Sequence, residues 1–154
     1  MSRLVQTSEN MQALGVCLSH ALRSRDVVLL TGEMGNGKSE LARGIARGLG
    51  IKGPVPSPSF TILNQYDDGA MPLYHFDWYR IDSPEELYES GLDEYIGHDG
   101  LTLIEWHEKA PELIPIDCLE IQITQLPSEA RSVTLHSHGE FRKINLDELC
   151  PDQE

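Results

Sequence analysis

The first fifty residues carry two amphipathic helix patterns separated by a short apolar run. After Thr7 and Ser8, residue types that often begin helices, apolar side chains recur at helical spacing: Met11, Leu14, Leu18, Ala21 and Leu22. Residues 26–31 are then almost continuously apolar, which is typical of a strand buried on both faces of a parallel sheet. A glycine-rich turn covers residues 32–38, and the pattern predicts a second helix over residues 39–49.

The rest of the chain alternates between turn-forming residues and short apolar runs. Glycines and prolines crowd residues 50–59, where neither a helix nor a regular strand can continue. A helix is predicted between residue 83 and Gly91, and strands are predicted over residues 60–66, 72–77, 101–105, 118–123 and 132–136. The acidic segment 145–154 is expected to fray, which leaves residues 1–144 as a single domain.

Composition restricts the partners that this domain can have. Its 154 residues are 40% apolar, enough for one sizeable core. Acidic residues outnumber basic residues 25 to 12, and the net charge of -13 repels nucleic acid. We therefore expect no DNA binding and no direct, tight binding of RNA. No signal peptide is visible, and no apolar run approaches the roughly 20 residues of a membrane span. We expect a cytoplasmic protein that does not contact membranes.

The cysteines support the same location. Cys17, Cys118 and Cys150 are odd in number, lie far apart in the sequence and include no CxxC pair. This pattern predicts neither a disulfide framework nor a zinc knuckle. A reducing compartment fits it best.

The strongest chemical signal is a glycine-rich run that matches G-x-x-x-x-G-K-[ST]: Gly32-Glu33-Met34-Gly35-Asn36-Gly37-Lys38-Ser39. Its glycines allow the chain to wrap backbone N–H groups around a phosphate, and the following helix adds its N-terminal dipole. Lys38 is suited to reach the β- and γ-phosphates, and the Ser39 hydroxyl is suited to bind Mg²⁺. With a buried strand before it and a helix after it, the run predicts an α/β fold of the P-loop NTPase type, a mostly parallel sheet flanked by helices.

A phosphate loop of this type also needs an acid at the end of a neighbouring strand to hold the metal. Glu105 ends an apolar strand and is preferred for that role, directly or through water. Asp77 ends a less apolar strand, and is expected to orient the attacking water or to act as a second metal ligand. The alternative for either residue is a solvated carboxylate at a strand end. Lys38, Asp77 and Glu105 are therefore the candidate catalytic residues.

The segment rich in proline carries three hydroxyls, Ser57, Ser59 and Thr61, where many P-loop proteins sense the γ-phosphate. The residues alone leave two interpretations of this segment open, a switch and a stiff connector.

His75 and His107 adjoin the proposed site, although hydrolysis at such loops works by positioning and charge stabilisation and needs no histidine. The adenine contacts are not evident, and Arg131 or residues 6–8 are candidates to close over a nucleotide.

Several blocks of sequence together resemble the bacterial TsaE family. Besides the glycine-rich loop, they are Val55-Pro56-Ser57-Pro58-Ser59-Phe60-Thr61, His75-Phe76-Asp77-Trp78-Tyr79-Arg80, Pro84-Glu85-Glu86-Leu87, Gly91-Leu92-Asp93-Glu94-Tyr95 and Leu103-Ile104-Glu105-Trp106. The resemblance extends from about Thr7 to Ile123. Four positions depart from the usual family residues, Asn36, Ser39, Ser59 and Trp78, and none of them removes a needed functional group.

The resemblance implies the ATPase component of tRNA threonylcarbamoyladenosine biosynthesis, with ATP and Mg²⁺ as cofactors. It implies weak hydrolysis that is stimulated by the TsaD–TsaB pair, the complex that transfers the threonylcarbamoyl group to adenosine 37 of ANN-decoding tRNAs. The tRNA would be met only through that complex. By the same resemblance Ser39 and Glu105 are Mg²⁺ ligands, Lys38 is the phosphate clamp, and Asp77 and Trp106 are functionally important neighbours.

Two other classes of protein contain a glycine-rich loop of this type. A small nucleotide or metabolite kinase would need a mobile, arginine-rich lid to exclude water, and a chain with 12 basic residues offers little material for one. A nucleotide-dependent binding module would need no turnover, and the presence of Lys38, Ser39 and Glu105 argues against it.

Overall fold

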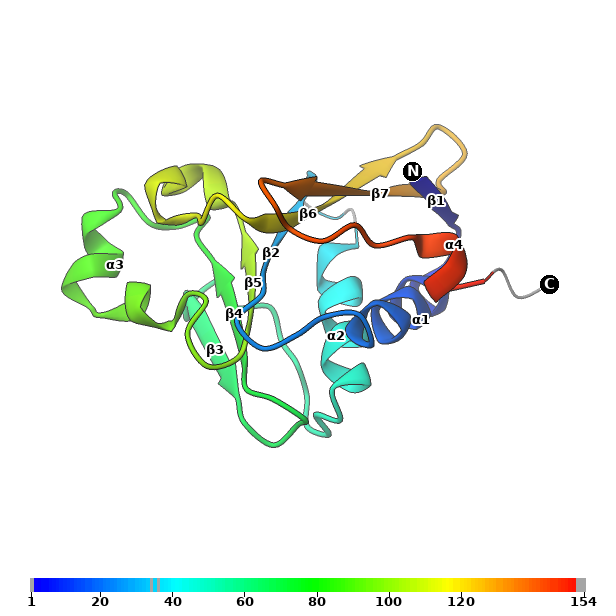
Figure 1. The fold of residues 1–154 in the computed structure, drawn as a ribbon. Coiled ribbons are helices and arrows are strands. Elements are labelled where there is room, and N and C mark those ends of the chain that lie inside the picture. The colour runs from blue at the N-terminus through cyan, green and yellow to red at the C-terminus, as the bar shows by residue number, and fades with distance from the viewer. Residues whose placement is uncertain (1, 34, 36, 152–154) are drawn as a thin grey trace.

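The computed structural model describes residues 2–33, 35 and 37–151. They form one seven-stranded sheet with the strand order β1-β7-β6-β2-β5-β4-β3, and helices pack against it (Figure 1). The strands are β1 Ser2–Val5, β2 Val27–Thr31, β3 Leu63–Tyr66, β4 Leu73–Asp77, β5 Leu101–Glu105, β6 Cys118–Gln125 and β7 Arg131–His138. In the described part of the chain, no helix has the length and apolar character needed to cross a membrane.

The centre of the sheet is parallel and its margins are antiparallel. β2 pairs in parallel with β5 on one side and β6 on the other, and β5 pairs in parallel with β4. β3, β7 and β1 are each added by an antiparallel pairing. The predicted α/β class is confirmed, and the sheet is more mixed than the apolar pattern alone indicated because its margins are built from antiparallel pairs.

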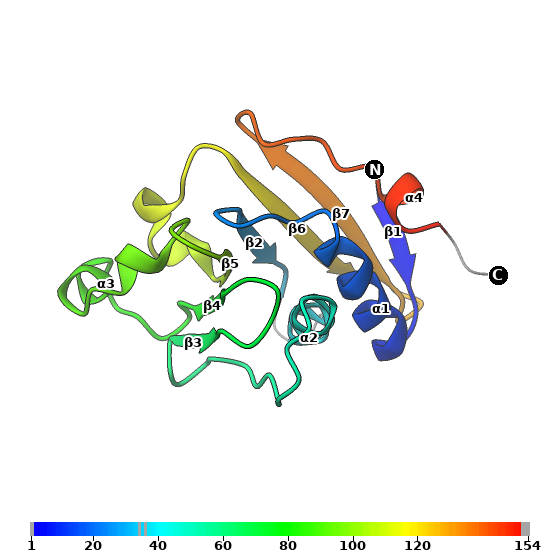
Figure 2. The same ribbon diagram turned by 60° about the horizontal axis from the view of Figure 1, so that its bottom comes forward.

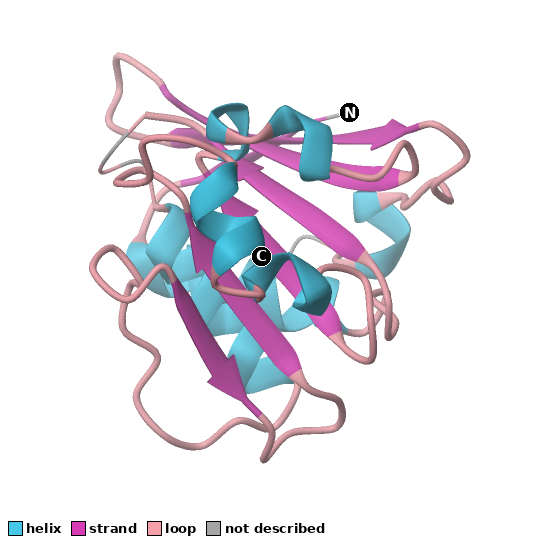
Figure 3. Ribbon diagram, turned by 90° about the vertical axis from the view of Figure 1, so that its left-hand side faces the viewer, coloured by secondary structure: helices cyan, strands magenta, loops and turns pink. Residues whose placement is uncertain are grey.

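Helices cover both faces of the sheet (Figure 3). They are α1 Ser8–Ser19, α2 Lys38–Gly48, α3 Glu85–Glu89 and α4 Leu146–Leu149, with 3₁₀ turns at Leu92–Tyr95, His107–Lys109 and Pro111–Leu113. Strand side chains alternate between the faces, so Val28 and Leu30 of β2 join the core under α1 and α2. Val27 and Leu29 point the other way, into a second core with Trp78.

Helices α1 and α2 lie side by side in close backbone contact (Figure 2). The reason is glycine on the facing surfaces: a Cβ at Gly44 would lie 2.1 Å from the carbonyl oxygen of Gln12, and one at Gly15 would lie 2.5 Å from that of Leu41. Thr7 begins α1 as expected, with its side-chain oxygen accepting a hydrogen bond from the Asn10 N–H at 3.0 Å. The close approach anchors α2, whose first residue is the lysine of the glycine-rich run.

Four strands differ from the prediction by more than one residue: β6 and β7 extend beyond their predicted bounds, to Cys118–Gln125 and Arg131–His138, and β1 and β3 differ more. β1 was not predicted, because its four residues have no alternating pattern and its partner, β7, lies more than a hundred residues away. β3 begins at Leu63 instead of residue 60. Ile62 has a φ of 68°, a left-handed conformation that interrupts an extended chain just before the strand.

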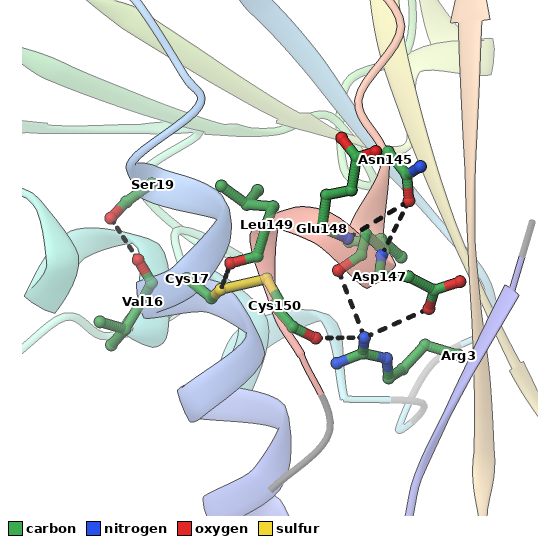
Figure 4. Close-up of a disulfide and its surroundings, with 10 residues drawn as sticks. Arg3, Val16, Cys17, Ser19, Asn145, Asp147, Glu148, Leu149 and Cys150 are labelled. Atoms are coloured by element: carbon green, nitrogen blue, oxygen red, sulfur yellow. Dashed lines mark hydrogen bonds and ion pairs between the residues drawn. A yellow bond between two sulfur atoms is a disulfide. The ribbon is translucent and has the colours of Figure 1, made fainter.

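The C-terminal segment is docked on the body of the protein as far as the structure describes it. We expected residues 145–154 to fray, but Asn145 caps α4 through a hydrogen bond from the Asp147 N–H at 3.0 Å, and Leu146 is buried. Arg3 of β1 holds the same turn, through hydrogen bonds to the carbonyl oxygens of Leu146 and Cys150 (Figure 4). Residues 152–154 lie outside the described residues.

The prediction that the cysteines form no disulfide is wrong. Cys17 of α1 and Cys150 form one, with their Cα atoms 5.8 Å apart and a separation of 133 positions along the sequence (Figure 4). The odd number of cysteines leaves Cys118 as a buried free thiol. Counting and spacing could not reveal the pair, because the fold alone brings the two chain ends together.

Replacing Cys150 by serine is expected to lower the free energy of unfolding by about 2–4 kcal/mol, because a crosslink over such a long loop restricts the unfolded chain. Urea unfolding without reductant measures the difference between parent and Cys150→Ser. Adding dithiothreitol should bring the parent to the stability of the variant and leave the variant unchanged. A variant as stable as the unreduced parent would contradict the crosslink.

Candidate functional site

The strand registers bring the predicted loop and the two predicted acids to one edge of the sheet. In the parallel pairing Leu30 of β2 lies opposite Glu105 of β5, and Glu105 lies opposite Asp77 of β4. The glycine-rich run begins two residues after Leu30. Because the carboxyl ends of parallel strands meet at one edge, three segments far apart in the sequence become neighbours.

A cavity of about 330 Å³ lies at this edge. It combines residues of the loop and the start of α2, the carboxyl ends of β4 and β5, and three more distant segments. Its lining residues are Ser8, Gly35, Gly37, Lys38, Ser39, Glu40, Ser57, Ser59, Asp77, Tyr79, Glu105, Trp106 and Arg131.

The loop has the backbone conformation that its glycines predict. Gly35 and Gly37 have φ values of 84° and 100°, which side chains disfavour, and α2 begins directly after Gly37. Lys38 is buried, and its Nζ donates to the carbonyl oxygen of Gly32 at 2.8 Å, across the loop. Glu33 is exposed and does not line the cavity. Met34 and Asn36, which were also predicted to bind the nucleotide, lie outside the described residues.

Both predicted acids are buried at the cavity instead of being solvated strand ends. Glu105 is 4% exposed and Asp77 is 5% exposed. Asp77 accepts a hydrogen bond from the Tyr79 N–H at 2.9 Å. Burial raises the pKa of the Asp77 carboxyl above its usual value; the bond from Tyr79 opposes the rise, and the charge of Glu105 adds to it. These two buried carboxylates, at paired positions of neighbouring strands, offer oxygen ligands for a cation.

The three hydroxyls of the segment rich in proline do not share one location. Ser57 and Ser59 line the cavity with their Oγ atoms 2.9 Å apart, and Ser59 Oγ lies 3.5 Å from Asp77 Oδ2. Thr61 does not line it: its hydroxyl is exposed and donates to Asn64 Oδ1 at 2.7 Å. The structure therefore brings Ser57 and Ser59 to the cavity and leaves Thr61 outside its lining.

Trp106 forms a wall of the cavity. It follows Glu105 directly and has a φ of 58°, a left-handed conformation that turns the chain sharply after β5. The centre of its ring lies 4.6 Å from Lys38 Nζ and 4.9 Å from the ring centre of Tyr79. A cation over an aromatic face is attracted to it, so Trp106 helps to hold the lysine at the loop.

Two further lining residues, Glu40 and Tyr79, were not predicted. Glu40 follows Ser39 in the first turn of α2, and Tyr79 stands two residues after Asp77, so proximity to a motif was the only signal available for either. Ser8 and Arg131, suggested as residues that close over a nucleotide, do line the cavity.

The lining offers the oxygen donors that Mg²⁺ prefers: the Ser39, Ser57 and Ser59 hydroxyls and two buried carboxylates. No group of three or more His, Cys, Asp or Glu side chains among residues 2–33, 35 and 37–151 could hold a metal alone. This donor set fits Mg²⁺, which takes one or two carboxylates and completes its shell with phosphate and water. Ser39 and Glu105, the predicted ligands, both belong to it.

A parallel central strand, a glycine-rich loop and a helix that begins at the loop lysine define a single-domain α/β protein of the P-loop NTPase type. The chain belongs to the TsaE family. The family described as "Threonylcarbamoyl adenosine biosynthesis protein TsaE" matches residues 5–133. Its place is therefore in the biosynthesis of threonylcarbamoyladenosine in tRNA.

Individual relatives are similar in sequence to this chain over most of its length. The tRNA threonylcarbamoyladenosine biosynthesis protein TsaE of Bacillus subtilis is 36% identical over 141 residues, which cover 92% of this chain and 88% of that protein. The protein of the same name from Rickettsia conorii is 34% identical over 149 residues, covering 94% and 85%. The crystal structure of Bacillus subtilis YdiB superposes with a TM-score of 0.78 at 33% identity, covering 90% of this chain and 86% of that one.

Proposed function

We propose that this chain is a Mg²⁺-dependent ATPase that binds the TsaD–TsaB pair and supports its turnover in the threonylcarbamoylation of adenosine 37 of ANN-decoding tRNAs. The observation that carries the proposal is the convergence of Lys38, Ser39 and Glu105 in one cavity at the carboxyl edge of the sheet. A match to the phosphate-binding pattern by itself would be weaker support, because the pattern does not include the carboxylate that binds the metal. Here the fold supplies that acid from a strand more than sixty residues away.

The charges of the cavity support the metal dependence. Glu40, Asp77 and Glu105 line it together with Lys38 and Arg131, on a protein whose net charge is -13. Arg43 pairs with Glu40, so the carboxylates of Asp77 and Glu105 are the ones that would repel a free triphosphate. A bound Mg²⁺ would supply the positive charge that neutralises both the carboxylates and the phosphates.

The residues of the chain have distinct parts in the proposed hydrolysis. Backbone N–H groups of the loop and the N-terminus of α2 hold the phosphates, and Lys38 stabilises the charge that develops on them. Ser39 and Glu105 would hold Mg²⁺. Asp77 is buried beside Glu105 and orients the attacking water. Ser59 links Asp77 to the segment rich in proline, which makes this segment a candidate for the part that responds to the γ-phosphate or to a partner.

Phosphate release from ATP, with and without purified TsaD–TsaB, tests the proposal. We expect slow release by the chain alone and a several-fold increase when the pair is added in the presence of Mg²⁺, with no increase in EDTA. The same mixture with the chain omitted controls for hydrolysis by the pair. Absence of any increase, together with stoichiometric phosphorylation of a small molecule, would instead identify a kinase.

A further inference from the structure

His75 is a buried polar residue to which the proposed hydrolysis assigns no role. It lies in β4 two residues before Asp77 and is 1% exposed. Its Nε2 lies 2.7 Å from Oε2 of Glu105. Its other ring nitrogen, Nδ1, is buried and has no hydrogen-bond partner within the described residues. Within the described residues, the hydrogen bond of this side chain is therefore with the predicted metal ligand.

The chemistry of the pair determines which atom donates. An ionised carboxylate can only accept hydrogen bonds, so the proton of the imidazole lies on Nε2. A buried carboxylate is costly unless a donor satisfies it. The bond from His75 satisfies Oε2 and leaves Oε1 without a bond to the imidazole.

We propose that His75 is a positioning residue whose Nε2–H orients the Glu105 carboxylate toward the cation. The inference rests on the proposed function, because it requires that Glu105 meets Mg²⁺ when nucleotide is bound. A bond of this kind stops the carboxylate from rotating and fixes the oxygen that it presents. Loss of such supporting partners typically weakens metal binding about 10- to 100-fold.

A structural role alone would give a different result, and the two amide substitutions separate the possibilities. The side-chain nitrogen of glutamine can occupy the place of histidine Nε2, whereas that of asparagine occupies the place of Nδ1. Because Nε2 is the ring nitrogen that has a hydrogen-bond partner in the described part of the chain, His75→Gln retains the donor to Glu105 and His75→Asn does not. If His75 merely fills space, the shorter and the longer amide have no reason to differ in metal dependence.

The experiment measures the affinity for ADP by calorimetry, with Mg²⁺ and with EDTA, for the parent and both variants. The readout is the ratio of the two affinities, the enhancement by Mg²⁺. We expect His75→Gln to lie within about threefold of the parent and His75→Asn to lose at least about tenfold, while affinities in EDTA stay within about threefold of one another. Circular dichroism and thermal unfolding check that each variant is folded.

Equal enhancement in the two variants, whether retained or lost, would overturn the proposal. Should His75→Asn not fold, His75→Gln decides by itself: retained enhancement supports the proposal and a tenfold loss overturns it. A parent that binds ADP without any enhancement by Mg²⁺ also overturns it and contradicts the metal dependence proposed above. A parent that binds no nucleotide at all would refute the proposed function itself, so the two failures are distinguishable.

Discussion

Lys38→Ala is expected to bind ATP at least about 100-fold more weakly than the parent and to release no measurable phosphate. The lysine is buried at the loop, where its Nζ donates to the Gly32 carbonyl oxygen and lies over the Trp106 ring. Contacts from a charged donor to phosphate are among the strongest hydrogen bonds, and a factor of 100 corresponds to about 3 kcal/mol. Arg43 already pairs with Glu40, whereas Asp77 and Glu105 would lose the nearby positive charge of Lys38, so their carboxylates would repel a triphosphate more strongly.

Calorimetry with ATP and Mg²⁺ measures the loss for Lys38→Ala. Lys52→Ala is the matched control, because Lys52 is exposed and lies outside the residues that line the cavity. The control should bind ATP like the parent. Binding by Lys38→Ala within threefold of the parent, on folded protein, would mean that the cavity does not hold a triphosphate.

Glu105→Ala is expected to separate binding from turnover. The carboxylate is needed for the metal, so the rate of phosphate release should fall about 100-fold or more, equivalent to roughly 3 kcal/mol of barrier. The affinity for nucleotide in EDTA should change little, because the loop, Lys38 and the N-terminus of α2 remain. Removing the side chain also leaves His75 without its hydrogen-bond partner, so the variant is checked for folding first.

The measurement for Glu105→Ala is phosphate release across a range of Mg²⁺ concentrations, beside nucleotide affinity in EDTA. Glu112→Ala provides a control in the following segment, since Glu112 is exposed and away from the cavity. If the variant and the parent show equal dependence on Mg²⁺, the metal is not held by Glu105, and Asp77 becomes the leading alternative.

The parts of the fold with strong local signals were predicted well. A continuous apolar run identifies β2, and β4 and β5 are likewise fully buried and close to their predicted bounds. The loop and the two acids could also be predicted, because each motif combines a residue type with a place at the end of a strand. The common edge of parallel strands then brings them together without further information.

The features that sequence reasoning missed depend on contacts between distant segments. β1 forms by antiparallel pairing with β7, and the disulfide forms because α1 and the C-terminal turn are adjacent. Thr61 lies outside the cavity lining for a local reason: its hydroxyl donates to the side chain of Asn64, next to the left-handed conformation of Ile62. The contact between His75 and Glu105 could not be predicted, because the register places His75 opposite Leu103 and the side chains alone bring Nε2 to the carboxylate.

The central position of β2 also determines when the cavity can exist during folding. Its two neighbours are distant in sequence: Val27 pairs with Thr102, and Val28 pairs with Leu119. Closing such long loops costs entropy before any contact is gained, and folding through distant contacts is slow. By contrast, α1 and α2 meet early in the chain and can associate first. A chain released from the ribosome before residue 105 would carry the loop and its lysine without the carboxylate that faces them.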